Sequence, residues 1–89
     1  MSIKINISPL FSQYTGNRHT TQGDGDTVGQ CLDHLVKQFP DMKKTLFNEN
    51  ELLPYIEIYI NGESAYPEEL AKPVKPGDEL YLLFTIDGG

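Results

Sequence analysis

Residues 27–40 read TVGQCLDHLVKQFP, and they form the clearest helical pattern in this 89-residue chain. Apolar side chains recur there every three or four positions, at Val28, Leu32, Leu35 and Phe39. Polar side chains take the opposite side, at Gln30, Asp33, His34 and Lys37. The spacing predicts an amphipathic helix over residues 28–39, capped by Asp26 or Thr27 and stopped by Pro40. Such a helix needs a second layer against its apolar face.

Strand patterns precede and follow this helix. Residues 2–8 alternate, with Ile3, Ile5 and Ile7 on one face, and Pro9 ends the run because proline cannot donate to a ladder. The further predictions are a turn at 14–17, a strand at 18–22, a helical turn at 41–48, strands at 54–60, 63–66 and 79–85, and a single helical turn at 67–70. This order predicts an α+β fold, with a mixed sheet of four to five strands packed on one main helix.

Composition limits the possible functions. The length predicts one domain, placed at residues 1–85, followed by a flexible diglycine tail at 86–89. A net charge of −6 disfavours binding to nucleic acid, whose phosphates attract Lys and Arg clusters. No run resembles a signal peptide or a membrane span, and the single cysteine allows no internal disulfide. We therefore expect a cytoplasmic protein, monomeric when free, without membrane contact.

No group of residues has a convincing catalytic, cofactor-binding or metal-binding pattern. Residues 23–29 read GDGDTVG, which is neither a dinucleotide-binding nor a P-loop motif, so a helix-capping loop is predicted there. Cys31 lies beside the apolar stripe and is expected to be a buried, inert thiol. His19 and His34 fall on different elements. We expect this chain to bind neither cofactor nor metal itself.

The sequence closes on Gly88-Gly89, directly after a strongly apolar stretch at 80–84. Glycine has no Cβ, so this carboxylate is slim enough to enter a narrow slot that bulkier residues would block. Such an end suits a carboxyl group that a partner enzyme modifies. The alternative is an incidental frayed tail, because glycine is common at chain ends.

The last strand gives a second indication. If Leu80, Leu82 and Phe84 face the helix, then Tyr81 and Leu83 point the other way, and Tyr59 shares that outer face. An apolar patch on the outside of a small sheet often marks a partner surface. The competing interpretation is that residues 11–14 cover the patch, or that it is too small to matter.

These features together resemble the ThiS/MoaD family of ubiquitin-like sulfur carrier proteins, which have the β-grasp fold. The resemblance is carried by the opening alternating strand, by Thr27-Val28-Gly29 before a Leu-rich helix, by residues 74–79 (VKPGDE) entering the last strand, and by the closing diglycine. It implies a protein co-substrate, or the small subunit of a synthase, rather than a self-sufficient enzyme. Gly89 would be adenylated by a partner and converted to a thiocarboxylate, and Gly88 would give the backbone clearance.

The same resemblance implies the partners. A ubiquitin-activating-enzyme-like adenylyltransferase would bind ATP and magnesium, and a synthase would accept the sulfur. The partner-binding residues would be Tyr59, Tyr81, Leu83 and Ile86. Molybdopterin, thiamin and sulfur amino acid synthesis stay open as pathways, since residues 84–87 (FTID) replace the Pro-rich lead-in common before the molybdopterin-type diglycine. A ubiquitin-like modifier joined to lysines is the alternative function.

Overall fold

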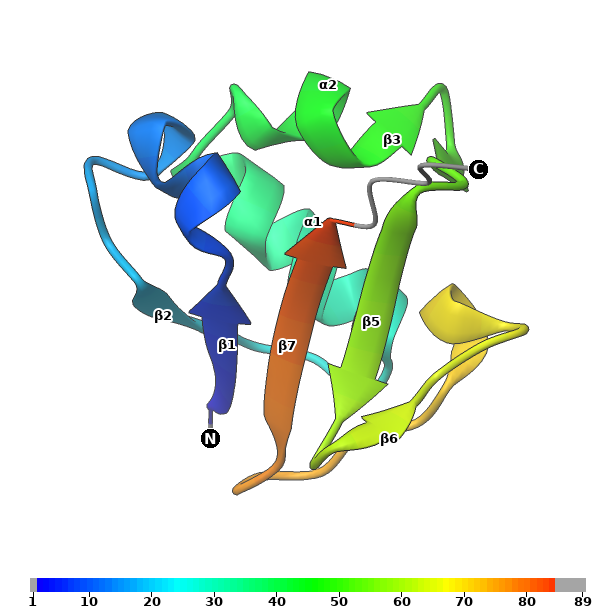
Figure 1. The fold of residues 1–89 in the computed structure, drawn as a ribbon. Helices are drawn as coiled ribbons and strands as arrows, with labels where there is room; N and C mark the ends of the chain where they lie inside the picture. The colour runs from blue at the N-terminus through cyan, green and yellow to red at the C-terminus, as the bar shows by residue number, and fades with distance from the viewer. Residues whose placement is uncertain (1, 85–89) are drawn as a thin grey trace.

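The computed structural model describes residues 2–84, and within them one five-stranded mixed sheet carries a helical layer on one face (Figure 1). Strands run in the order β2-β1-β7-β5-β6. Their bounds are Ile3–Ile7 for β1, Thr20–Gly23 for β2, Ile56–Ile60 for β5, Glu63–Ser64 for β6 and Glu79–Phe84 for β7. The predicted α+β fold with one mixed sheet and one main helix is confirmed.

Strand β7 lies in the middle of this sheet. It runs parallel to β1, with Ile5 opposite Leu80, and antiparallel to β5, with Tyr59 opposite Tyr81. The register places every second residue of β1, β5 and β7 on the inner face, as alternation in a strand requires. The central strand is therefore the one that leads directly to the end of the sequence.

Helix α1 (Val28–Gln38) covers the inner face of the sheet. Of the two predicted caps, Thr27 is the one used, because its side chain accepts a hydrogen bond from the Gln30 amide at 3.2 Å. The helix ends at Gln38 with Phe39 as C-cap, one residue earlier than predicted and directly before Pro40. Its apolar side and the inward strand residues form one core: Ile3, Ile5, Ile7, Phe11, Val28, Cys31, Leu32, Leu35, Met42, Leu46, Ile56, Ile58, Ala65, Val74, Leu80 and Leu82.

Two segments before α1 differ from the prediction. A 3-10 helix, η1 (Pro9–Tyr14), follows β1 where only a strand end was predicted, and the Ser8 side chain accepts from the Leu10 amide at 3.3 Å. The second strand begins at Thr20 and not at residue 18. The Arg18 amide still bonds the Thr15 carbonyl at 3.2 Å, so this residue belongs to the preceding turn.

The segment after α1 contains a small second sheet that was not predicted. Helix α2 (Met42–Leu46) ends before Phe47, which lies in β3 (Phe47–Asn48) and pairs with β4 (Glu51–Leu52). Strands of two residues are too short for alternation to reveal them.

The other boundaries shift by one to two residues. Strand β5 begins at Ile56, whose amide bonds the Leu53 carbonyl at 3.1 Å in a turn, and β6 ends at Ser64. The predicted helical turn at 67–70 is a 3-10 helix, η2 (Glu69–Ala71), that begins after Pro67. Strand β7 is described as far as Phe84. No helix within residues 2–84 is both long and apolar enough to span a membrane.

Candidate functional site

The candidate site begins where β7 ends. Phe84 is the last described residue, so the predicted site residues Ile86, Gly88 and Gly89 lie outside the described part of the chain. The structure does describe the surface around Phe84, from which the predicted diglycine tail continues. Two apolar features lie there, one on the outer face of the sheet and one at the end of β7.

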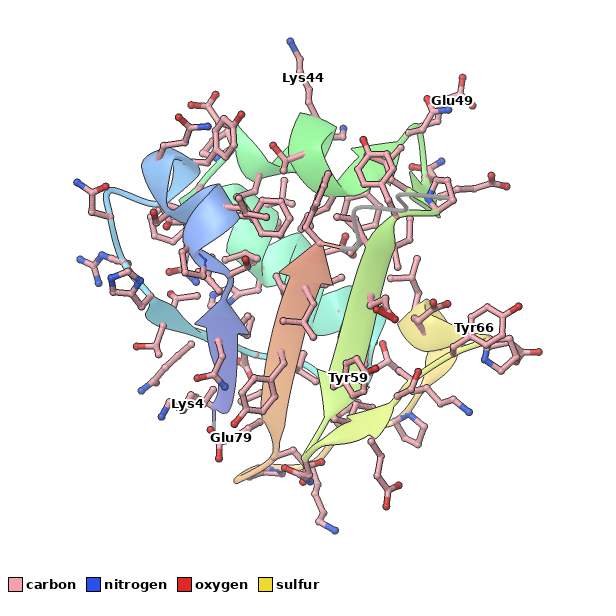
Figure 2. All side chains as sticks on the ribbon, viewed as in Figure 1. Lys4, Lys44, Glu49, Tyr59, Tyr66 and Glu79 are labelled. Carbon is pink, nitrogen blue, oxygen red and sulfur yellow. The ribbon has the colours of Figure 1, made fainter. Side chains whose placement is uncertain are left out.

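The first feature is the outer patch, which we define as Tyr59, Tyr81 and Leu83. Tyr59 and Tyr81 are direct cross-strand partners, and Leu83 is opposite Glu57. Tyr81 is 37% exposed and Leu83 is 40% exposed, both on the face away from α1. Figure 2 shows Tyr59 over β5 on this same face. The structure thus brings together all three predicted residues that it describes.

Polar groups border the outer patch on its β1 side. Asn6 lies opposite Tyr81 and donates from Nδ2 to the Leu80 carbonyl at 3.2 Å and to Glu79 Oε1 at 3.3 Å. Lys4 Nζ lies 3.7 Å from Glu79 Oε1. Both charged side chains are about half exposed, so this ion pair adds little stability. An apolar centre with a polar border is the usual anatomy of a protein–protein interface.

Residues 11–14 do not cover the outer patch, so that part of the competing interpretation is wrong. Phe11 is buried at 2% exposure and turns inward, where its ring meets Phe84 edge-on with centroids 6.0 Å apart. The side chains of Tyr81 and Leu83 are therefore still exposed on the outer face of the sheet. Within residues 2–84, no segment covers the outer patch, so it is accessible to a partner.

The second feature is a cleft of about 580 Å³ at the end of β7, here called the tail-end cleft. Its apolar lining includes Leu10, which is 55% exposed, and Tyr55, whose ring centroid lies 4.9 Å from that of Phe84. Asp41 and Lys44 of the α2 region supply its charges. Sequence reasoning missed this cleft, because η1, α2 and the start of β5 meet there from distant parts of the chain. The available signal was three aromatic residues, with Phe11 after the first predicted strand, Tyr14 in a predicted turn and Tyr55 at the start of a predicted strand.

The titratable groups inside the fold suit structural roles. Burial raises the pKa of the Cys31 thiol, and the carboxylates of Asp24 and Asp26 raise it further, so the nucleophilic thiolate is disfavoured. Asp78 lies at the opposite end of β7 from the cleft. The hydrogen bond from Asn61, at 2.9 Å, and the one from the Lys75 amide, at 2.9 Å, lower the pKa of its carboxyl group. Among the described residues, no cluster of His, Cys, Asp or Glu has the arrangement of a metal site.

The sequence matches the model of the ThiS family over residues 11–89. It is also 40% identical over 66 residues to a protein of Archaeoglobus fulgidus described as "Putative sulfur carrier protein". That match covers 71% of this chain and 74% of the relative.

Solved structures share the fold over nearly the full length. A chain of the Amycolatopsis orientalis BexX/CysO complex superposes with a TM-score of 0.88 at 27% identity, covering 98% of this chain and 99% of that one. SAMP1 from Haloferax volcanii gives a TM-score of 0.85 at 31% identity, covering 100% of both chains. The mixed sheet with its covering helix is therefore a ubiquitin-like β-grasp, and this protein belongs to the ThiS/MoaD family.

Proposed function

We propose that this protein carries sulfur as a thiocarboxylate on the carboxyl group of Gly89. The observation that carries the proposal is the family match, which extends through residue 89 and so includes the diglycine. The fold supports it, because the central strand β7 leads directly into the residues that precede Gly89. In this role the protein is a co-substrate that other enzymes charge and discharge.

The chemistry follows from the properties of a carboxylate. An α-carboxyl group has a pKa of about 3.3–3.7, so near neutral pH it is an anion and a poor electrophile. Attack of one carboxylate oxygen on the α-phosphorus of ATP forms an acyl adenylate and releases pyrophosphate. Hydrosulfide then attacks the acyl carbon, AMP leaves with that oxygen, and a thiocarboxylate remains. ATP and magnesium belong to the activating partner, an adenylyltransferase related to the ubiquitin-activating enzymes, and a synthase takes the sulfur afterwards.

The outer patch is the proposed docking surface for the adenylyltransferase. It lies on the strand that leads to the tail, and Gly89 is six positions after Leu83, a reach of at most about 22 Å. A partner seated on Tyr59, Tyr81 and Leu83 therefore has the carboxyl group within range of its own active site. The similar CysO chain of Amycolatopsis orientalis was crystallised in complex with BexX, which agrees with a carrier that acts through docking. Ile86 remains a predicted additional contact.

The test is intact-mass analysis after charging. The purified protein is incubated with its adenylyltransferase, MgATP and sodium sulfide, and the expected product has one oxygen replaced by sulfur. Pyrophosphate exchange, measured in parallel, reports adenylation by itself. Adenylation without the mass change would overturn sulfur carriage. A variant lacking Gly89 should lose both signals while its circular dichroism spectrum and melting temperature stay unchanged, whereas an incidental tail would tolerate the deletion.

A second function is favoured by one observation, the 31% identity with SAMP1 over the whole of both chains. SAMP1 stands for small archaeal modifier protein 1. The same acyl adenylate would then pass its acyl group to a lysine amine of a target protein, forming an isopeptide bond. Tagged protein purified from its own cells should carry branched peptides that end in Gly-Gly on lysine. Their absence under conditions that yield the thiocarboxylate would exclude the modifier function there.

A further inference from the structure

A groove of about 830 Å³, here called the side groove, borders the outer patch on its β5 side. Two residues connect these surfaces. Glu57 lines the side groove and lies opposite Leu83, and Ser64 lines it and lies opposite Tyr59. Residues directly opposite each other on neighbouring strands project from the same face of a sheet. The side groove therefore adjoins the outer patch, and one partner can cover both.

Large hydrophobic side chains are exposed in the side groove. Tyr66 lines it and is 74% exposed, and Figure 2 shows this residue projecting beyond β6, away from the sheet. Tyr55 lines it as well, at 39% exposure. With Tyr81 and Leu83 they make up four of the six large hydrophobic side chains that are exposed within residues 2–84. Such clustering marks an interaction surface, whereas a single exposed apolar residue needs no explanation.

The charges that line the side groove have one sign. Its charged lining residues are Glu57 and Glu69, and no Lys or Arg of residues 2–84 lines it. Lys72 and Glu63 line an adjoining depression that shares Ser64, and their opposite charges offset each other there. The side groove thus has an acidic field that attracts basic groups.

Position along the sheet distinguishes Glu57 from Glu79, which is also on the outer face. Glu79 begins β7, and Lys4 lies 3.7 Å from it in an ion pair (Figure 2). Glu57 lies opposite Leu83, near the end of β7 that leads to the tail. Its carboxylate has no ion pair within residues 2–84. A basic group of a partner placed there gains a charge contact without breaking an internal one.

We propose that the adenylyltransferase covers the side groove together with the outer patch and places a Lys or Arg side chain there against the carboxylate of Glu57. The apolar stem of that side chain packs on the exposed ring of Tyr66. Glu57 is thus a specificity-determining residue, because a single charge pair beside an apolar patch fixes the orientation of the docked protein and hence the direction of its tail. The inference rests on the proposed function, since it names the chemistry of that partner. A second copy of this chain would bring the same carboxylates and would be repelled.

The test is titration calorimetry of the full chain with its adenylyltransferase, at about 50 mM and about 300 mM salt. Glu57→Gln keeps the size of the side chain and removes its charge, so the Kd should rise about three- to fivefold at the lower salt concentration and less at the higher one. Glu57→Lys brings like charges together and should raise the Kd about tenfold or more. Asp33→Lys makes the same charge change at an exposed position of α1 and should leave the Kd within about twofold.

Tyr66→Ser tests the aromatic part of the side groove. It should raise the Kd about three- to tenfold and leave the circular dichroism spectrum unchanged, because the side chain is largely in solvent. Equal effects of Glu57→Lys and Asp33→Lys would overturn the proposal. So would an unchanged Kd in both Glu57→Lys and Tyr66→Ser.

Pyrophosphate exchange separates failure of this inference from failure of the proposed function. At saturating concentrations the Glu57 variants should be adenylated at the original rate, because the acyl group is unaltered. If Leu83→Thr weakens binding and Glu57→Lys does not, the outer patch still docks the enzyme and only the role of Glu57 is wrong. If the original protein is not adenylated at any concentration, the proposed function is wrong and this inference fails with it.

Discussion

Replacing Tyr81 and Leu83 by threonine tests the outer patch as the docking surface. Threonine keeps a high strand propensity and removes most of the apolar area that these side chains expose. Full burial of an apolar side chain of this size stabilises by roughly 1.5–3 kcal/mol. Tyr81 is still 37% exposed and Leu83 40%, so a partner that covers them gains about 0.6–1.2 kcal/mol from each. The double variant should therefore lose about 1–2 kcal/mol of binding free energy, a rise in Kd of roughly 5- to 30-fold.

The assay is titration calorimetry of the protein with its adenylyltransferase, followed by pyrophosphate exchange. The variant should raise KM and leave kcat at saturation close to the original value, because docking and not the acyl group is altered. Val36→Ala is the matched control, since Val36 lines a pocket on the α1 side of the fold, away from the outer patch. Circular dichroism checks that both variants are folded. A Kd within twofold of the original, or an equal loss with Val36→Ala, would refute the reasoning.

Three further predictions concern the fold that presents the tail. Gly23→Ala should lower the free energy of unfolding, measured in urea, by about 1–3 kcal/mol, because the added Cβ would lie 2.8 Å from Ile5 Cδ1. Adding Ile5→Val should recover part of the lost stability. An unchanged urea midpoint in Gly23→Ala would show that the site can relax. Because the pKa of Asp78 is lowered, its carboxylate stabilises the fold above the ordinary pKa of aspartate and loses that effect as pH falls through the lowered value. Asp78→Asn should therefore be less stable near neutral pH and lose less stability between about pH 5 and about pH 2 than the original protein, and parallel pH profiles from urea unfolding would contradict this. Cys31 is fully buried and the pKa of its thiol is raised, so iodoacetamide should label it at about pH 8 only after unfolding in urea. Rapid labelling of the folded protein would show that α1 opens locally.

The sequence predicted best those parts of the fold in which side-chain alternation extends over several residues. Ile3, Ile5 and Ile7 placed β1 correctly, and the same alternation placed Tyr81 and Leu83 on the outer face. Elements held by backbone hydrogen bonds over only two residues, such as β3 and β4, leave too short a pattern to be detected.

The tail-end cleft was beyond sequence reasoning for a different reason. It joins η1, the α2 region, the end of β7 and Tyr55 just before β5, so its existence depends on tertiary packing. The end of β6 was also missed, because the sequence predicted a strand over 63–66 where only Glu63–Ser64 pair.

The central position of β7 also affects how the protein is made. Both neighbours of this strand, β1 and β5, are synthesised before it, and neither can pair on its β7 side until residues 79–84 leave the ribosome. Pairing of the first strand with the last gives the contacts a long sequence separation, which slows folding relative to a helical protein of this size. A nascent or prematurely terminated chain thus lacks the strand that completes the core. Under the proposed function, an adenylyltransferase that recognises the finished sheet would meet the tail only on chains translated to completion.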